Sequence, residues 1–144
     1  MSLNQISVFV ENKPGKLQAL TEILAKMDVN MRALSLAETA EFGIVRIIVD
    51  ELESAAEMLK AEGYIYTITK VLGVAIPDDP GGLNRVLKIL NQTGINVEYM
   101  YAFLGGKSAT NAYMIFHVKD REEAVAALQA QGIECITQSE LVGL

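Results

Sequence analysis

The sequence is poor in the residues that most often build metal centres and disulfides. Its 144 residues include one cysteine, Cys135, one histidine, His117, and no tryptophan. A single cysteine excludes a disulfide within the chain, and the two residues are too few for a Cys/His zinc cluster formed by one chain. One histidine also leaves few parts for imidazole acid–base catalysis. The composition therefore argues against an enzyme, and we expect no cofactor and no metal.

Charge and hydropathy argue against two further classes. The chain has 18 acidic and 12 basic residues, a net charge of −6, and no run of Lys or Arg, so we expect no nucleic-acid partner. No apolar run approaches the roughly 18 residues of a membrane helix. Residues 1–5 have neither the basic stretch nor the apolar core of a secretion signal. We therefore expect a cytoplasmic protein with no membrane partner. With 51% apolar residues, the chain can build a packed core.

The sequence contains an internal repeat. Residues 11–31 match residues 77–97 at an offset of 66, with Pro, Gly, Leu, Ile and Asn residues identical at equivalent places. Further along the chain the offset is 69, so the second copy has three extra residues, which we place at the turn Gly105-Gly106-Lys107. We predict two domains, residues 1–70 and residues 71–144, with no flexible linker between them.

Each copy has the hydrophobic pattern of strand, helix, strand, strand, helix, strand. In the first copy we predict strands at 6–10, 29–37, 44–49 and 64–70, helices at 17–27 and 52–59, and a turn near Glu41-Phe42-Gly43. In the second copy we predict strands at 72–76, 95–104, 110–118 and 133–137, and helices at 83–90 and 124–128. This order is that of the ferredoxin-like βαββαβ unit, an α+β fold that places two helices on one face of an antiparallel sheet.

The third predicted strand of each copy is apolar on both faces. In the first copy, Ile44 and Ile48 alternate with Val45, Ile47 and Val49. A strand with one face in water would alternate with polar residues. We therefore infer that part of the helix-free face is covered, either because two units share one long sheet or because a second chain packs there. We expect a homodimer.

Two loops at equivalent places in the repeat have features of an anion site. Asn12-Lys13-Pro14-Gly15 and Asp78-Asp79-Pro80-Gly81-Gly82 each join a first strand to a helix. The free N–H groups and the dipole of a helix start attract a carboxylate, and an oxygen of Asn12 or Asp78 could accept a hydrogen bond from an ammonium group. The alternative is that Asn and Asp are ordinary helix N-caps and that Pro-Gly is ordinary turn chemistry.

The same residues carry a family resemblance. Glu11-Asn12-Lys13-Pro14-Gly15-Lys16-Leu17, a helix, and then Asp28-Val29-Asn30-Met31 resemble an ACT domain, especially the regulatory domain of phosphoglycerate dehydrogenase. The pattern recurs from Pro77 through Leu83 and from Gly94 to Val97, so the resemblance covers essentially the whole chain.

ACT domains bind small effectors, usually amino acids, at interfaces between domains. The resemblance implies a stand-alone tandem ACT protein that binds a free amino acid as a regulatory sensor. The alternative is a regulatory or interaction subunit of an enzyme of amino acid metabolism, with vestigial ligand sites of its own.

The resemblance also implies which residues contact the ligand: Asn12 and Asp78 on the loops, and Asn30 and Asn96 from a neighbouring domain. The pairs are Asn12 with Asn96 and Asp78 with Asn30 if the halves of one chain meet, or Asn12 with Asn30 and Asp78 with Asn96 if identical halves meet in a dimer. The sequence departs from the dehydrogenase at Val10, where the latter has histidine, so serine is not implied as the ligand. The complete set of expected ligand-site residues is Asn12, Lys13, Pro14, Gly15, Lys16, Leu17, Asn30, Met31, Asp78, Asp79, Pro80, Gly81, Gly82, Leu83, Asn96 and Val97.

The charges of the two loops predict unequal sites. Lys13 and Lys16 lie near Asn12 in the sequence and favour a bound carboxylate. Asp78 and Asp79 favour an ammonium group but repel a carboxylate. We therefore expect the Asn12 loop to bind the ligand more tightly.

Overall fold

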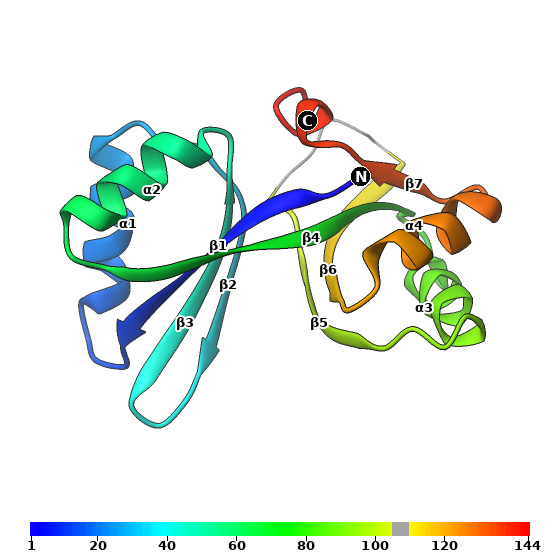
Figure 1. Ribbon diagram of the computed structural model, residues 1–144, viewed down its shortest axis with the longest axis horizontal. Coiled ribbons are helices and arrows are strands. Elements are labelled where there is room, and N and C mark those ends of the chain that lie inside the picture. The colour runs from blue at the N-terminus through cyan, green and yellow to red at the C-terminus, as the bar shows by residue number, and fades with distance from the viewer. Residues whose placement is uncertain (105–109) are drawn as a thin grey trace. The chain divides into compact units, whose positions relative to one another are not determined.

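The chain folds into two compact units, one formed by Asn4–Thr69 and the other by Met1–Leu3 with Lys70–Leu144. The computed structural model describes residues 1–104 and 110–144 (Figure 1). The turn Gly105-Gly106-Lys107, where we placed the extra residues of the second copy, lies outside the described residues. Among the described residues, no helix is both long and apolar enough to cross a bilayer.

The first unit is a four-stranded antiparallel sheet with both helices on one face (Figure 1). Its strand order is β2-β3-β1-β4, and β3 pairs antiparallel with both of its neighbours. The strand β4 is long, and only its first residues, up to Thr69, belong to this unit. The elements are β1 (Leu3–Glu11), α1 (Lys16–Lys26), β2 (Met31–Glu38), β3 (Phe42–Val49), α2 (Leu52–Ala61) and β4 (Ile65–Pro77).

The second unit repeats this architecture with the remainder of β4 as its first strand. Its strand order is β4-β6-β5, and β7 pairs with β4 on the other side. The elements after β4 are α3 (Gly82–Gln92), β5 (Val97–Ala102), β6 (Asn111–Val118), α4 (Arg121–Ala130), β7 (Glu134–Ile136) and the short α5 (Gln138–Leu141). The structure thus confirms two ferredoxin-like units.

Each unit has its own core between the helices and the sheet. The apolar stripe of α1 and α2 packs against alternate residues of β1 and β3, because successive strand residues point to opposite faces. The second core is built in the same way from α3, α4, β4 and β6. On the helix-free faces, Ile48 and Ile115 are fully buried, whereas Ile44 and Tyr113 are partly exposed.

Two local predictions were wrong. The turn predicted at Glu41-Phe42-Gly43 lies earlier, because β3 already begins at Phe42, which pairs with Glu11. Gly43 is a strand residue here: a Cβ would lie 3.1 Å from Leu36 Cδ1, so glycine relieves crowding instead of making a turn.

The end of the second copy also differs from the prediction. Its last strand is only three residues long, and the chain then forms α5. Thr137 and Glu140 cap this helix reciprocally, which is the capping-box pattern of Thr followed three residues later by Glu.

Candidate functional site

The two predicted loops have the same backbone conformation. The Asn12 N–H donates to the Glu41 carbonyl at 3.0 Å, and the equivalent Asp78 N–H donates to the Thr110 carbonyl at 2.8 Å. One residue later, the N–H of Lys13 or Asp79 bonds the carbonyl two residues before it, at 2.9 Å in both loops. Each loop is therefore fastened to the strand hairpin beside it, and both present the following helix in the same way.

Each helix begins at a glycine with a left-handed backbone. Gly15 has φ +85° and Gly81 has φ +89°, a region in which a side chain is strained. A Cβ on either glycine would meet no atom of the described residues within 4 Å, so none of these residues fills the space directly beside either glycine. The glycines are thus required by the turn, and they also leave that space clear.

Among the residues that the structure describes, no side chain caps either helix start. Asn12 and Asp78 lie three residues before the cap positions, so the alternative that they are ordinary N-caps is wrong. The chain does use side-chain caps elsewhere, since Asp120 accepts from the Glu123 N–H at 3.1 Å at the start of α4. The first N–H of each helix donates to a loop carbonyl, from Lys16 to Lys13 at 3.3 Å and from Gly82 to Asp79 at 3.1 Å. The attraction for an external anion therefore rests on the remaining N–H groups of the first turn and on the helix dipole.

The Asn12 side chain is oriented by the adjacent hairpin. Its Nδ2 donates to the Thr39 carbonyl at 3.2 Å, and within the described part of the chain its Oδ1 accepts no hydrogen bond. Asn12, Lys13 and Glu41 line an open hollow of about 560 Å³ at the surface. Asn12 can therefore offer an acceptor to an ammonium group, as the loop chemistry predicts.

Glu11 modifies the charge of the first loop in a way that we had not predicted. Its carboxylate lies 3.0 Å from Lys13 Nζ and 3.7 Å from Lys16 Nζ. Its hydrogen bond with Lys13 lowers the pKa of the Glu11 carboxyl, and the charge of Lys16 acts in the same direction. The two lysines therefore share one counter-charge, and the first loop has a smaller positive excess than the lysines alone suggest.

The second loop is more acidic and more tightly built. Asp78 and Asp79 are both exposed, and Pro77 stands where the first loop has Glu11. Gly82 is buried, and a Cβ there would collide with the Pro77 carbonyl oxygen. The equivalent residue of the first loop is Lys16. The two loops therefore share their backbone hydrogen bonds, but only the first has room for a side chain at this position.

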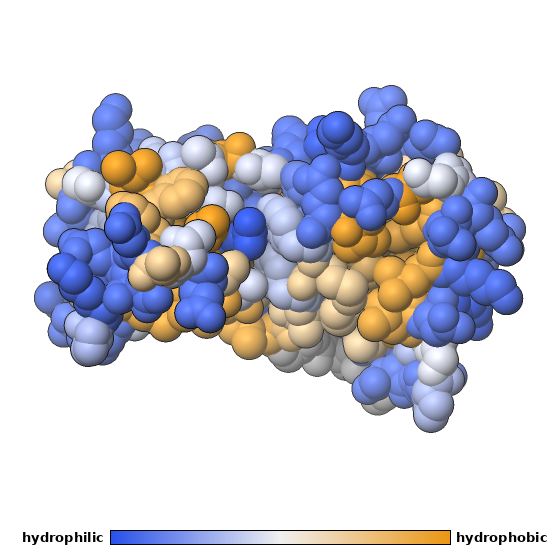
Figure 2. All heavy atoms as spheres, turned by 90° about the horizontal axis from the view of Figure 1, so that it is seen from below, coloured by the Kyte–Doolittle hydropathy of each residue, from blue (hydrophilic) through white to orange (hydrophobic). Residues whose placement is uncertain are grey.

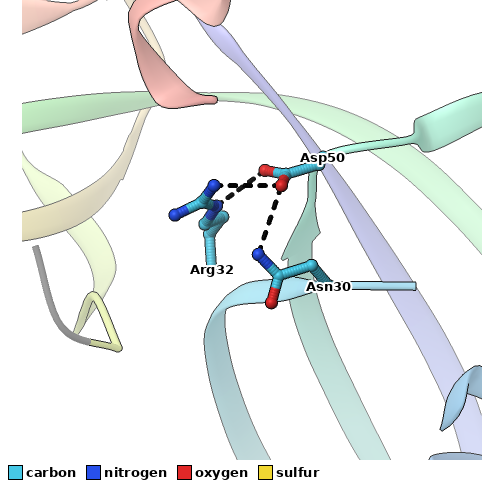
Figure 3. Close-up of polar contacts among 3 residues, drawn as sticks. All are labelled: Asn30, Arg32 and Asp50. Carbon is cyan, nitrogen blue, oxygen red and sulfur yellow. Dashed lines mark hydrogen bonds and ion pairs between the residues drawn. The ribbon is translucent and has the colours of Figure 1, made fainter. Parts of the chain in front are cut away.

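Asn30 belongs to a polar cluster at the start of β2 (Figure 3). Its Nδ2 donates to Asp50 Oδ2 at 3.2 Å, while Arg32 donates from Nε to Asp50 Oδ1 at 2.7 Å and from Nη2 to Asp50 Oδ2 at 3.0 Å. The Arg32 hydrogen bonds lower the pKa of the Asp50 carboxyl, and the Asn30 bond adds to this. The side-chain oxygen Oδ1 of Asn30 points away from Asp50 (Figure 3).

The equivalent cluster of the second unit has the opposite arrangement of charge. Glu98 stands at the place of the arginine and Lys119 at the place of the aspartate, beside Asn96. These three residues line an open hollow of about 320 Å³. Glu98 Oε2 lies 2.9 Å from His117 Nδ1. The two groups form an ion pair only if the imidazole is charged, and their contact does not have the geometry of a hydrogen bond.

The loop and the Asn30 cluster lie at opposite ends of the first unit. Glu11, next to Asn12, pairs with Phe42 at the start of β3, while Met31, next to Asn30, pairs with Val49 at its end. At about 3.3 Å per residue, the eight residues of β3 separate these ends by roughly 25 Å. Within one unit, the structure therefore does not bring Asn12 and Asn30 together.

The same separation holds in the second unit. Pro77, next to Asp78, pairs with Asn111 at the start of β6, and Val97, next to Asn96, pairs with Val118 at its end. A ligand that contacts a loop and a strand start must therefore take them from different units.

The other predicted site residues divide between core and surface. Leu17 and Met31 pack against the first core, and Val97 packs against the second. Leu83 is 38% exposed, and Pro14 and Pro80 are exposed in their loops. Sequence reasoning missed Glu11, Arg32 and Asp50, although the opposite charges of the last two at adjoining strand ends were a usable signal.

The fold and the paired loops define a duplicated ferredoxin-like module with two uncapped helix starts. The family model of the ACT domain pair matches residues 1–144. The chain therefore belongs to the family of ACT domain pairs, which are regulatory rather than catalytic modules.

Solved structures share the fold of this chain. Protein BT0572 from Bacteroides thetaiotaomicron is 35% identical, with a TM-score of 0.91 over 100% of this chain and 98% of that one. The regulatory subunit of aspartate kinase from Thermus thermophilus is 19% identical, with a TM-score of 0.61 and 90% of each chain covered. The corresponding subunit from Thermus flavus is 17% identical, with a TM-score of 0.62 and 88% of each chain covered. The two kinase subunits share the fold. Among curated proteins, no sequence matches significantly.

Proposed function

We propose that this protein is a cytoplasmic regulatory sensor that binds a free amino acid. The observation that carries the proposal is a pair of helix starts that no described side chain caps. Each follows a left-handed glycine, and a Cβ on that glycine would meet no described atom within 4 Å. Such a helix start attracts a carboxylate, and the nearby Asn12 oxygen can accept from an ammonium group. A free amino acid carries both groups on one carbon.

In this proposal each site is completed by a second unit. Asn30 and Asn96 lie far from the loop of their own unit, so the strand start must come from a neighbour. Asp50 holds the Asn30 amide in one orientation and leaves its oxygen for the ligand. A site of this kind couples ligand binding to the association of units, which is how a small molecule can change the behaviour of a larger assembly.

We also propose that the protein forms a homodimer, which would supply further neighbouring units. Sedimentation equilibrium should give the mass of two chains at micromolar concentration. The mass of one chain at every accessible concentration would contradict this part of the proposal.

A second function is supported by the second loop. Asp78 and Asp79 repel a ligand carboxylate, and the sequence of this loop contains no lysine, whereas Lys13 and Lys16 belong to or directly follow the first loop. If the first loop also fails to bind, the protein would be an interaction subunit of an enzyme of amino acid metabolism with vestigial sites.

Thermal unfolding with each of the twenty amino acids separates these functions. A ligand at a hundred times its Kd adds about 2.7 kcal/mol to the free energy of unfolding, so the sensor predicts a clear rise in Tm with one or a few amino acids. No rise with any of them would contradict the sensor and favour the interaction subunit.

A further inference from the structure

Exposed apolar side chains surround a second hollow beside the first loop. Phe9 is 37% exposed, Phe42 49% and Ile65 72%, and all three line an open hollow of about 320 Å³. Each points away from the core, because its strand neighbour Val10, Gly43 or Tyr66 faces the helices. Lys16 and Glu62 reach the same hollow from the helix side, because it lies at the end of the sheet, where β1 ends and β3 and β4 begin. Hydrophobic side chains reach the surface at several places in Figure 2, but large exposed ones that share a hollow indicate an interaction site.

The second unit provides an internal comparison. Ala75 takes the place of Phe9, since Ala75 pairs with Tyr113 as Phe9 pairs with Ile44. Asn111 takes the place of Phe42, since Asn111 pairs with Pro77 as Phe42 pairs with Glu11. Glu134 takes the place of Ile65. The second unit thus forms the same fold without these large apolar side chains. Folding alone therefore does not account for them in the first unit.

Charged groups in the same hollow complement a zwitterion. Lys16 contributes an ammonium group, and Glu11 and Glu62 contribute carboxylates. Lys16 Nζ and Glu11 Oε1 are 3.7 Å apart and about half exposed, so both remain accessible to a ligand. The volume lies at the lower end of the roughly 300–1,000 Å³ that is typical of small-molecule sites.

We propose that this hollow receives the side chain of the ligand, so that the first unit recognises an amino acid with a large apolar or aromatic side chain. The inference rests on the proposed function and names the class of ligand. Lys16 and the start of α1 bind the carboxylate, and Phe9, Phe42 and Ile65 contact the side chain. The ammonium lies where this hollow adjoins that of Asn12, since Glu11 and Phe42 line both, and it is bound by the Asn12 oxygen and the Glu11 carboxylate. The second unit, with alanine, asparagine and glutamate at those places, does not share this preference.

The experiment measures the affinity of L-phenylalanine, L-leucine and L-alanine by calorimetry on the full chain. The variants Phe9→Ala and Phe42→Asn introduce the residues of the second unit. Leu36→Ala is the matched control, because Leu36 is 54% exposed on β2, lies outside the hollow, and is alanine at the equivalent place of the second unit. Circular dichroism checks that each variant is folded.

We expect the wild type to bind L-leucine or L-phenylalanine at least about tenfold more tightly than L-alanine. Phe9→Ala and Phe42→Asn should each remove about tenfold of the affinity for the larger ligand, while Leu36→Ala leaves it unchanged. Equal affinity for L-alanine and the larger ligands, or unchanged affinity in both hollow variants, would overturn the inference and leave the proposed function standing.

Two other outcomes also have a definite meaning. If no amino acid binds the wild type, both the proposed function and this inference are wrong. If Phe42→Asn converts a dimer to a monomer in sedimentation without changing affinity, the hollow is a contact between copies of the chain and the ligand assignment is wrong.

Discussion

Removing the Asp50 carboxylate should destabilise the first unit by a measurable amount. Asp50→Ala removes two hydrogen bonds from Arg32 and one from Asn30. A hydrogen bond to a charged group contributes about 1.5–3 kcal/mol, but the Arg32 and Asp50 side chains are 17% and 19% exposed, so water replaces part of the loss. We expect the free energy of unfolding to fall by about 2 kcal/mol for Asp50→Ala and by about 1 kcal/mol for Asp50→Asn, which keeps an acceptor.

The pH dependence of this effect follows from the lowered pKa of Asp50. The interaction stabilises the folded chain above the unfolded-state pKa of about 3.9, and the contribution is lost as the pH falls through the still lower folded-state pKa. Urea unfolding followed by circular dichroism should therefore separate wild type from Asp50→Asn at neutral pH and bring them together in acid. Glu57→Gln, an exposed change on α2, is the control. An Asp50→Ala variant as stable as this control would refute the reasoning.

Two further predictions concern the loops. Gly82→Ala should lower the free energy of unfolding by about 2–3 kcal/mol in urea titrations, because its Cβ would collide with the Pro77 carbonyl oxygen, and Lys16→Ala at the equivalent place should be nearly neutral. A stable Gly82→Ala would show that the loop relaxes easily. In calorimetry with the amino acid selected by thermal unfolding, Asn12→Ala should remove more binding heat than Asp78→Ala, and the reverse order would make the second loop the principal site.

Hydrophobic periodicity was sufficient to predict most of the fold. The stripes of α1 and α3, and the alternation in β1 and β3, place one apolar face of each element on a core, so their positions follow from the sequence. The turn near Gly43 was misplaced because glycine signals a turn, whereas here its missing Cβ makes room for Leu36 in the sheet. The α5 helix was missed although Thr137 and Glu140 form a recognisable capping box.

The candidate site was predictable only as separate parts. The glycine and proline of each loop fixed its backbone, and repetition along the chain drew attention to it. The charges were harder to predict, because Glu11 lies in the strand before the loop. Its carboxylate meets Lys13 across the tight turn at Asn12 and meets Lys16 only after the chain has turned back at Pro14. Asp50 is twenty residues from Asn30 and meets it through the pairing of β2 with β3. Such contacts depend on strand register, which loop composition does not define.

The central claim is that the loops before α1 and α3 bind a free amino acid. Its most direct test is a calorimetric titration of the wild type and of the Gly15→Val/Gly81→Val double variant with the amino acid selected by thermal unfolding. Valine at each left-handed position costs about 1–2 kcal/mol of backbone strain and places a branched side chain beside the helix start, where a Cβ would meet no described atom within 4 Å. We predict saturable binding heat for the wild type and none for the variant, which circular dichroism should show to be folded. Equal binding by the folded variant, or no saturable heat with any amino acid in the wild type, would contradict the claim.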